Sequence, residues 1–529
     1  MTSMVDNSKE RNRDSGRNST PRPDIIFYLV CTIGTAYFVY QRGQDRNWDL
    51  LNYHYYQGYA LWTDRFMQDV AAANLQSFLN PIINLFAYLS LTYLPYPLNA
   101  WSFLVIQLAS IPAIVLLAKE IGGALGYTKT LIPSVSTILL CLLSPMWASE
   151  LGTTFFSSWT APFILWGVYF LYTGNSEVSS SRTQTVLSGV LFGLATGLKL
   201  TNAPYAVAAL LMIAVLVYGE SWQNTASKFA YFLIGCGAGF VFSAWWHWHL
   251  WVTWENPVFP LYNAIFKSEY YDYVNFRDSR WIFSSLQDFM LFLVQSSFGT
   301  NKASEVPFAD IRYLVLASLA PATLLFKPAT KLNRQLISFL TFMFFGLFLW
   351  AVMFAYQRYL IPLELLLGLV IWIFVARIVE REWLRKGLII GLTLLSAYMM
   401  KIPDWGHAPM TAGEKNPFSI KIDKKLTATP ARYIVVGVPI SYVLPSFHSA
   451  SIFYGVGFSR QVDELVYQRL AEPSDMPLRI LAKDADAYSL LERLKRTGFN
   501  PSENLLACDY FTTGIGRYIV CEVKQRKQQ

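Results

Sequence analysis

Long apolar runs, separated by short polar connections, fill the sequence between residues 24 and 401. A helix needs about 20 mostly apolar residues to cross the hydrocarbon core of a bilayer, and a few fewer at the short end of the range. The pattern therefore predicts an α-helical polytopic membrane protein with about eleven transmembrane helices. A shorter amphipathic stretch, 284–298, predicts a helix that lies along the membrane surface. The predicted crossings are 24–40, 98–118, 130–147, 160–174, 185–199, 203–219, 229–248, 312–326, 335–355, 359–377 and 386–401.

Basic residues in the connections predict the orientation of these helices, because positively charged loops stay on the cytoplasmic side. The clearest basic runs lie in 327–334 and 377–386. The polar, basic tail 1–23 is expected to be disordered and cytoplasmic. Alternation then places two long loops, 41–97 and 249–311, on the extracytoplasmic side. The eleven crossings and these two outer loops together form one transmembrane module that covers 24–401.

The pattern changes after residue 401, where apolar runs become short. We expect 402–529 to form a small soluble α/β domain, which the alternation of crossings places outside the cytoplasm. Cys508 and Cys521 lie in expected strands. They could pair in an oxidising compartment, but nothing in the sequence shows that the two strands are neighbours. The strand-like runs are 432–438, 450–455, 478–482 and 518–523, and a helical pattern covers 485–496.

Composition agrees with a membrane protein and argues against a soluble enzyme. Of the 529 residues, 53% are hydrophobic and 15% are charged, whereas soluble domains carry about 25% charged residues. The net charge of +8 is spread over short runs between apolar segments. It therefore does not form the basic stripe that nucleic-acid binding requires.

The first outer loop carries the most unusual segment of the chain, residues 44–56. On a helix, its polar residues recur at spacings of three and four and share one face. Such a face suits the hydroxyl groups of a sugar, and a carboxylate on it could accept a proton. The alternative is a surface helix whose polar face meets water. The candidates are Asp45, Asp49, Asn52, Tyr53 and Tyr56 on this face, with His54 in the same segment.

The second outer loop embeds polar and charged residues among aromatic residues over 254–281. This combination suits a ligand with an anionic part and a ring-shaped part. The alternative is a structural loop that ion pairs hold in place. The candidate binding residues here are Asn256, Lys267, Asp278 and Arg280.

Two further basic residues, Lys199 and Arg358, lie at the predicted outer ends of helices. Charges near membrane depth are costly and usually face a cavity or a partner. A guanidinium group is well suited to bind phosphate, so Arg358 is a candidate for that role and Lys199 a second one. Arg358 could instead pair with Glu364, or extend its charge to the membrane surface.

The layout resembles the GT-C superfamily of membrane glycosyltransferases: a first crossing, a long outer loop with an early aspartate, many further crossings and an outer domain. The segments NWDLLNYHYY, QSFLNP, ENPVFPLYNAIFKS and QRYLIPLE look like those of a bacterial group within it. The resemblance implies a polyprenyl-phosphate sugar donor, Asp49 as catalytic base with Asp45 as a weaker candidate, and an inverting transfer in the bacterial cytoplasmic (inner) membrane. The acceptor would be a glycan, lipid or protein of the cell envelope. Some members have adjacent acidic residues in this loop. Here they are four apart, so no metal ligand is assigned and use of a divalent cation stays open.

A transporter or lipid flippase is the main alternative. That function predicts charged residues in the middle of helices and helices broken at mid-membrane. A polymerase or ligase with a diphosphate-linked donor and a non-catalytic assembly protein are further alternatives. The charges of this chain cluster instead at outer helix ends and in outer loops, which favours chemistry at the membrane surface.

Overall fold

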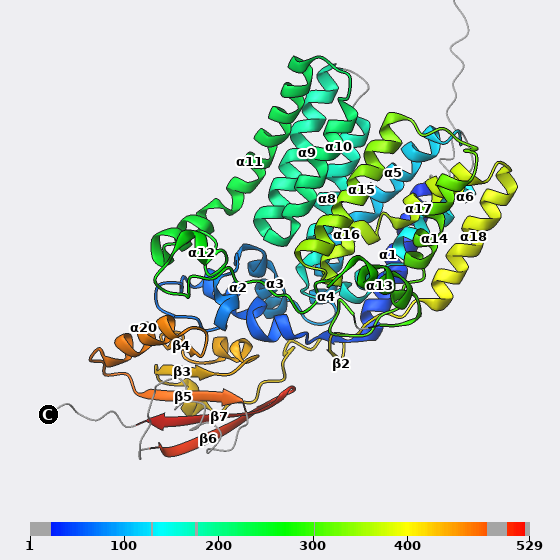
Figure 1. Cartoon of the computed structure of the whole chain (residues 1–529). Coiled ribbons are helices and arrows are strands. Elements are labelled where there is room, and N and C mark those ends of the chain that lie inside the picture. Colours follow the sequence, from blue (N-terminus) through cyan, green and yellow to red (C-terminus); the bar gives the residue numbers. More distant parts are fainter. Residues whose placement is uncertain (1–22, 128–130, 175–177, 301, 484–504, 524–529) are drawn as a thin grey trace, which may run out of the picture.

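The computed structural model describes residues 23–127, 131–174, 178–300, 302–483 and 505–523. Figure 1 shows a helical bundle, a β-sheet domain at one end of it, and the elements of the first outer loop between the two. The expected tail 1–23 and the helical pattern over 485–496 fall almost entirely outside the described residues.

Each predicted crossing contains a helix, because each long apolar run satisfies its backbone polar groups internally. Three of them, Leu98–Ala124, Trp222–Trp254 and Arg334–Met353, are long and apolar enough to cross a membrane on these grounds alone within the described chain. A fourth is the bent pair Gln357–Glu364 and Leu367–Ile378, with a 52° bend. The number eleven stays a prediction. The bundle helices are α1 (Pro23–Arg42), α4 (Leu98–Leu108), α5 (Ser110–Ala124), α6 (Leu131–Leu142), α8 (Phe156–Thr173), α9 (Val178–Leu198), α10 (Ala203–Leu216), α11 (Trp222–Trp254), α14 (Arg312–Leu325), α15 (Arg334–Met353), α16 (Ile361–Glu364), α17 (Leu367–Ile378) and α18 (Glu382–Met399).

Helices α9 and α11 pack unusually closely, along a seam of small residues. A Cβ atom built on Gly193 would lie 2.0 Å from the carbonyl oxygen of Cys236, and one on Gly239 would lie 2.1 Å from that of Val190. Small residues let the backbones of membrane helices approach in this way. The seam holds the outer end of α9, and so Lys199 just after it, against the rest of the bundle.

Short elements make up the outer loops. The expected helix over 284–298 is confirmed as α13. The first loop contains η1 (Leu50–His54, a π-type turn), α2 (Tyr55–Trp62), η2 (Asn74–Phe78) and α3 (Ile82–Tyr93), the second contains α12 (Asn263–Phe266) and α13 (Leu286–Phe298), and the other connections contain α7 (Pro145–Glu150), η3 (Leu200–Asn202) and η4 (Gln357–Leu360).

The C-terminal region forms a five-stranded mixed sheet in the order β4-β3-β5-β7-β6. Strand β3 pairs in parallel with β4 and β5, while β7 pairs antiparallel with β5 and β6. All four predicted strand runs are confirmed. The elements are β3 (Arg432–Val436), η5 (Ser441–Ser446), β4 (Ile452–Val456), α20 (Arg460–Ala471), β5 (Leu478–Lys483), β6 (Leu505–Thr513) and β7 (Gly516–Val523), after a short α19 (Lys424–Thr427).

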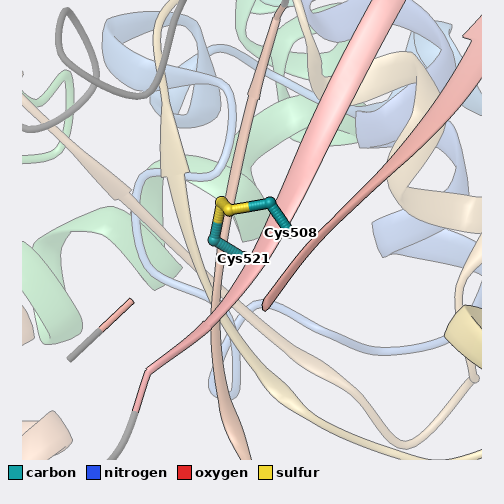
Figure 2. Close-up of a disulfide and its surroundings, with 2 residues drawn as sticks. All are labelled: Cys508 and Cys521. Carbon is teal, nitrogen blue, oxygen red and sulfur yellow. A yellow bond between two sulfur atoms is a disulfide. The ribbon is translucent and has the colours of Figure 1, made fainter. Parts of the chain in front are cut away.

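Cys508 and Cys521 face each other in the β6–β7 ladder and form a disulfide (Figure 2). Their Cα atoms are 4.1 Å apart, a short separation that directly opposed antiparallel residues can provide. The sequence did not decide whether these two cysteines pair, and the structure shows a disulfide between them on neighbouring strands.

The first outer loop is attached to the C-terminal domain at two places. Strand β1 (Gln44–Asp45) pairs antiparallel with β2 (His407–Ala408). Farther along, Val70 bridges Tyr454 on the edge strand β4, and the amide of Gly455 donates to the carbonyl of Val70 at 2.8 Å. The loop is thus clamped between bundle and sheet.

Candidate active site

An ion pair between Asp49 and Arg358 lies at the centre of the candidate site. Arg358 Nη1 donates to Asp49 Oδ2 at 3.1 Å, although the residues are 309 positions apart. The side chain of Asp49 is only 19% exposed and that of Arg358 only 11%. Asp49 immediately precedes η1, and Arg358 lies in η4, where the chain turns before α16. The fold therefore brings together the predicted base and the predicted phosphate ligand.

Aromatic rings surround the Arg358 guanidinium. Its carbon atom lies 4.0 Å from the ring centre of Phe155, 4.9 Å from that of Tyr356 and 5.0 Å from that of Trp405. Arg358 Nε also donates to the Tyr356 hydroxyl at 2.8 Å, and that hydroxyl donates to Glu305. Stacked rings hold the planar guanidinium in one orientation. Phe155 and Trp405 are site residues that sequence reasoning missed.

Glu150 and Lys199 add one charge of each sign near the ion pair. Glu150 is fully buried; one carboxylate oxygen accepts from the amide of Ser158 at 2.8 Å, and the other has no partner in the described part of the chain. Burial raises the pKa of Glu150 to about 7, while Arg358 and Lys199 pull it down. Lys199 Nζ donates to Ser157 Oγ at 2.6 Å, at the start of α8.

Glu150 was also missed by the sequence reasoning. Its signal is one acidic residue within an otherwise uncharged stretch, 130–176, at a place between two predicted crossings. An ionisable residue in such a place is costly and points to function.

The predicted helix over 44–56 is wrong at its beginning. Asp45 lies in strand β1, where it pairs with His407, and helical structure begins only beside Asp49. The Asp45 carboxylate accepts hydrogen bonds from Asn47 and from the amide and hydroxyl of Thr154, at 2.8 to 3.1 Å. Asp45 is 1% exposed. It therefore does not share a helical face with Asp49, because its carboxylate organises the turn that precedes the helix.

The remaining polar residues of this segment are divided between two sides of the helix. Tyr53 is half-buried beside Asp49, and burial raises the pKa of its hydroxyl. Asn52 instead donates to Gln76 at 3.2 Å, and Tyr56 donates to Asp69 at 2.5 Å. Asn52 and Tyr56 are buried. The alternative of a surface helix whose polar face meets water is therefore wrong.

His54 is buried between the same helix and the start of α8. Its Nδ1 lies 3.0 Å from Thr154 Oγ1, and that hydroxyl gives its proton to Asp45. Nδ1 must then be the donor, so Nε2 keeps its lone pair, and Nε2 has no partner among the residues described. Burial lowers the pKa of His54 to about 3, which makes the imidazole a neutral hydrogen-bond acceptor.

The second outer loop contributes less than the sequence predicted. Asn256 is fully buried and donates to the carbonyl of Leu261 at 2.9 Å. Lys267 is exposed at the end of α12. Asp278 and Arg280 form an exposed ion pair at 2.7 Å. The alternative of a structural loop held by ion pairs fits the Asp278–Arg280 pair, whereas Asn256 makes neutral hydrogen bonds within the loop.

Arg280 nevertheless lies near the rim of the site. Its guanidinium lies 5.4 Å from the ring centre of Trp281, and Trp281 stacks on Tyr356 at 5.8 Å. Tyr356 in turn contacts Arg358. A ligand bound at Arg358 could therefore extend toward Arg280.

The alternative pairing of Arg358 with Glu364 is wrong. Glu364 is fully buried and accepts from Tyr313 at 2.8 Å, and also from Gln357 and Ser144. Gln357 neighbours Arg358 in η4, and Ser144 precedes the helix that ends at Glu150. Glu364 therefore ties together the segments that carry the site without entering it.

No group of three or more His, Cys, Asp or Glu side chains is placed to hold a metal ion in the described ranges. The charged partner of Asp49 is a guanidinium rather than a second carboxylate. These residues do not make a ligand set for a divalent cation.

Comparisons with known proteins agree on the type of fold. A sequence model of Glycosyltransferase family 87 matches residues 78–262. The structure of ArnT from Cupriavidus metallidurans bound to undecaprenyl phosphate superimposes with a TM-score of 0.58 at 13% identity, covering 94% of this chain and 97% of ArnT. Its apo state gives 0.55 at 12% identity, with the same shares covered.

An oligosaccharyltransferase from Archaeoglobus fulgidus gives a TM-score of 0.48 at 11% identity, over 87% of this chain and 69% of that one. No curated protein sequence matches the chain. The family model over 78–262 and the fold shared with ArnT make the chain similar to glycosyltransferases of the GT-C type.

Proposed function

We propose that the enzyme moves a sugar from a polyprenyl-phosphate donor to an acceptor hydroxyl, with inversion, at the extracytoplasmic face of the bacterial inner membrane. The product would be a cell-envelope glycan or glycolipid. The observation that carries the proposal is the Asp49–Arg358 pair, a carboxylate and a guanidinium in contact within a nearly buried site. The likeness to a structure that holds undecaprenyl phosphate supports the donor class.

The donor phosphate binds to Arg358, with Lys199 as a second cation. A guanidinium held between aromatic rings offers two parallel N–H groups to phosphate oxygens. As the bond between the anomeric carbon and the phosphate oxygen breaks, the electron pair leaves with the phosphate. Arg358 stabilises the charge that develops there.

Asp49 accepts the proton of the acceptor hydroxyl as its oxygen attacks the anomeric carbon from the opposite face, through an oxocarbenium-like state. The phosphate competes with Asp49 for Arg358, so donor binding frees the carboxylate to act as a base. Tyr53, and His54 through Nε2, provide hydrogen-bonding groups for the sugar or acceptor. Asp45, Asn52 and Tyr56 support the helix that carries Asp49.

The proposed topology keeps tail 1–23 in the cytoplasm, the module 24–401 in the membrane and the domain 402–529 outside. The disulfide between Cys508 and Cys521 supports that placement, because disulfides persist in oxidising compartments. The attachment of the domain to the first outer loop supports a placement of both on the same side of the membrane.

The test incubates the purified protein with a panel of polyprenyl-phosphate sugars and measures release of polyprenyl phosphate. We expect one donor to be consumed by the wild type and not by Asp49→Asn. Consumption of none, together with lipid or sugar flux in liposomes, would support a transporter instead. One observation favours that second function: the bent pair at 357–378 is a broken helix of the kind transporters use.

A further inference from the structure

A cleft separate from the Asp49 site lies where the first outer loop meets the C-terminal domain. Its volume is about 760 Å³, which is within the range of ligand-binding sites. One wall comes from the end of α2 and the residues after it, and the other comes from the β4 edge and the end of α20. Residues that line it include Tyr59, Thr63, Arg65, Ala450, Tyr454 and Arg469.

Behind the wall of this cleft lies a guanidinium for which the described residues provide no carboxylate partner. Arg432 is 2% exposed and uses Nη1 to donate to the carbonyls of Leu470 and Glu472. Its Nε and Nη2 have no hydrogen-bond partner in the described ranges. Arg432 pairs in register with Ile452, a lining residue, and Glu472 also lines the cleft. Unpaired buried donors of a charged group are costly.

The charges around the cleft leave it positive. Arg65 is neutralised by Asp69, at 2.6 Å. Arg469 donates to the carbonyl of Met67 at 3.2 Å and so keeps its positive charge. Glu472 is the one acidic residue among the lining residues. The guanidinium of Arg469 in the lining and that of Arg432 behind the wall therefore outnumber the single carboxylate of Glu472.

The cleft also has the surfaces that bind sugars. Thr63 is exposed and offers a hydroxyl, and the edges of the mostly buried Tyr59 and Tyr454 complete the wall. Tyr59 lies on α2, which continues the helix that begins beside Asp49. Ten residues of helix rise by about 15 Å. A chain-like ligand could therefore reach both the cleft and the catalytic carboxylate.

We infer that this cleft binds a distal, anionic and hydroxyl-rich part of the acceptor: a glycan segment that carries carboxylate or phosphate groups. The inference rests on the proposed function and adds the chemical class of the acceptor. Arg469 in the lining and Arg432 behind the wall supply the positive charge, and the Thr63 hydroxyl can bond to the sugar units.

The test measures binding of fluorescently labelled tetragalacturonate, a glycerol-phosphate oligomer and neutral maltotetraose to the full-length protein in nanodiscs. Arg469→Gln removes a cleft cation, and Ala450→Trp fills the cleft. Arg460→Gln is the matched control, because Arg460 lies on the same helix and pairs with Glu464 outside the lining. We expect at least one anionic probe to bind more tightly than maltotetraose. Loss of one charge-assisted contact in Arg469→Gln, and loss of space in Ala450→Trp, should each weaken binding about fivefold or more. The control should bind like the wild type.

Equal binding of all three probes, no binding, or unchanged affinity in both cleft variants would overturn the inference. The stronger anionic probe tells whether carboxylate or phosphate is preferred. Donor consumption is measured in parallel on the same variants and should persist, because neither residue lies in the Asp49 site. If the wild type itself consumes no donor, the proposed function fails, whatever the binding measurements show.

Discussion

A carboxylate that is paired with an arginine accepts a proton poorly until another anion binds to the arginine. Asp49 and Arg358 are in contact at 3.1 Å and nearly buried, so each holds the other's charge in the absence of substrate. The phosphodiester monoanion of the proposed donor competes better for a guanidinium than one carboxylate oxygen does, because it can bind through two oxygens. Under the proposed function, the pair would couple donor binding to activation of Asp49 as the base.

Replacing Asp49 by Asn separates these two roles. Without a base, the transfer rate should fall by about 10²- to 10⁴-fold, while donor affinity should stay the same or rise because Arg358 loses its competitor. Single-turnover transfer and a donor titration measure the two quantities. Asp45→Asn is the control: its carboxylate bonds Asn47 and Thr154, so that change should lower the unfolding temperature more than it alters chemistry. A transfer rate within about tenfold of the wild type in Asp49→Asn would remove Asp49 from the mechanism.

The second prediction concerns Glu150 and pH. Burial raises its pKa to about 7, so it is neutral below that pH and negative above it. Ionisation places a negative charge close to Arg358 and Lys199, which should weaken phosphate binding. At an effective dielectric constant near 20 the effect is about 1 kcal/mol or more, or about fivefold in KM for the donor. We expect this KM to rise between pH 6 and 8 in the wild type and to stay flat in Glu150→Gln. A parallel rise in the variant would show that Glu150 is not the titrating group.

Sequence reasoning identified residues of this site one at a time. Asp49 and Arg358 were each chosen for their residue type and position, but their contact spans 309 residues and depends on the whole fold. The prediction placed Asp45 on the helix because the helical spacing of polar residues includes it. In the structure Asp45 pairs with His407 in a strand, and a contact so distant in sequence leaves no local signal. Phe155 and Trp405 carry no local signal, since an aromatic residue is ordinary at a membrane boundary.

At the level of elements, the seam between α9 and α11 predicts a contrast between two glycines on one helix. A Cβ on Gly239 would meet the carbonyl oxygen of Val190 at 2.1 Å, whereas one on Gly237 meets nothing within 4 Å. Ala is the better helix former at both places, by about 0.5–1 kcal/mol. Gly239→Ala should nevertheless destabilise the protein by about 1–3 kcal/mol, because the helices must separate. Thermal unfolding in detergent checks this, with Gly237→Ala as the control. Equal unfolding temperatures for the two variants would contradict the close packing.

The elements themselves were largely predictable. Apolar runs of sufficient length became helices, and β-branched runs such as 432–436 became strands, because both patterns follow directly from burial. Helix α20 escaped prediction, since only Val462, Val466 and Leu470 mark its buried face among many charges. The order of the strands in the sheet, and the attachment of Val70 to its edge, depend on contacts distant in sequence.

At the scale of the whole molecule, orientation depends on how many helices cross between the basic loop near Lys327 and the C-terminal domain. Helices α15 and the bent pair meet the criteria of length and hydropathy. Helix α18 (Glu382–Met399) is less apolar, but it exposes Trp383, Leu394 and Tyr398, as a helix in contact with lipid would. If all three cross, the loop and the domain lie on opposite sides of the membrane.

Cysteine labelling decides this. Lys327 and Asp475 are both exposed, so Lys327→Cys and Asp475→Cys can each react with a membrane-impermeant maleimide. In intact spheroplasts we expect Asp475→Cys to react and Lys327→Cys to react only after the membrane is opened, with the unmodified protein as the background. Labelling of both before opening would mean that α18 lies along the surface and does not cross. Labelling of Lys327→Cys alone would show that the protein has the opposite orientation in the membrane. The Asp49 site would then have to take its donor from the cytoplasmic leaflet.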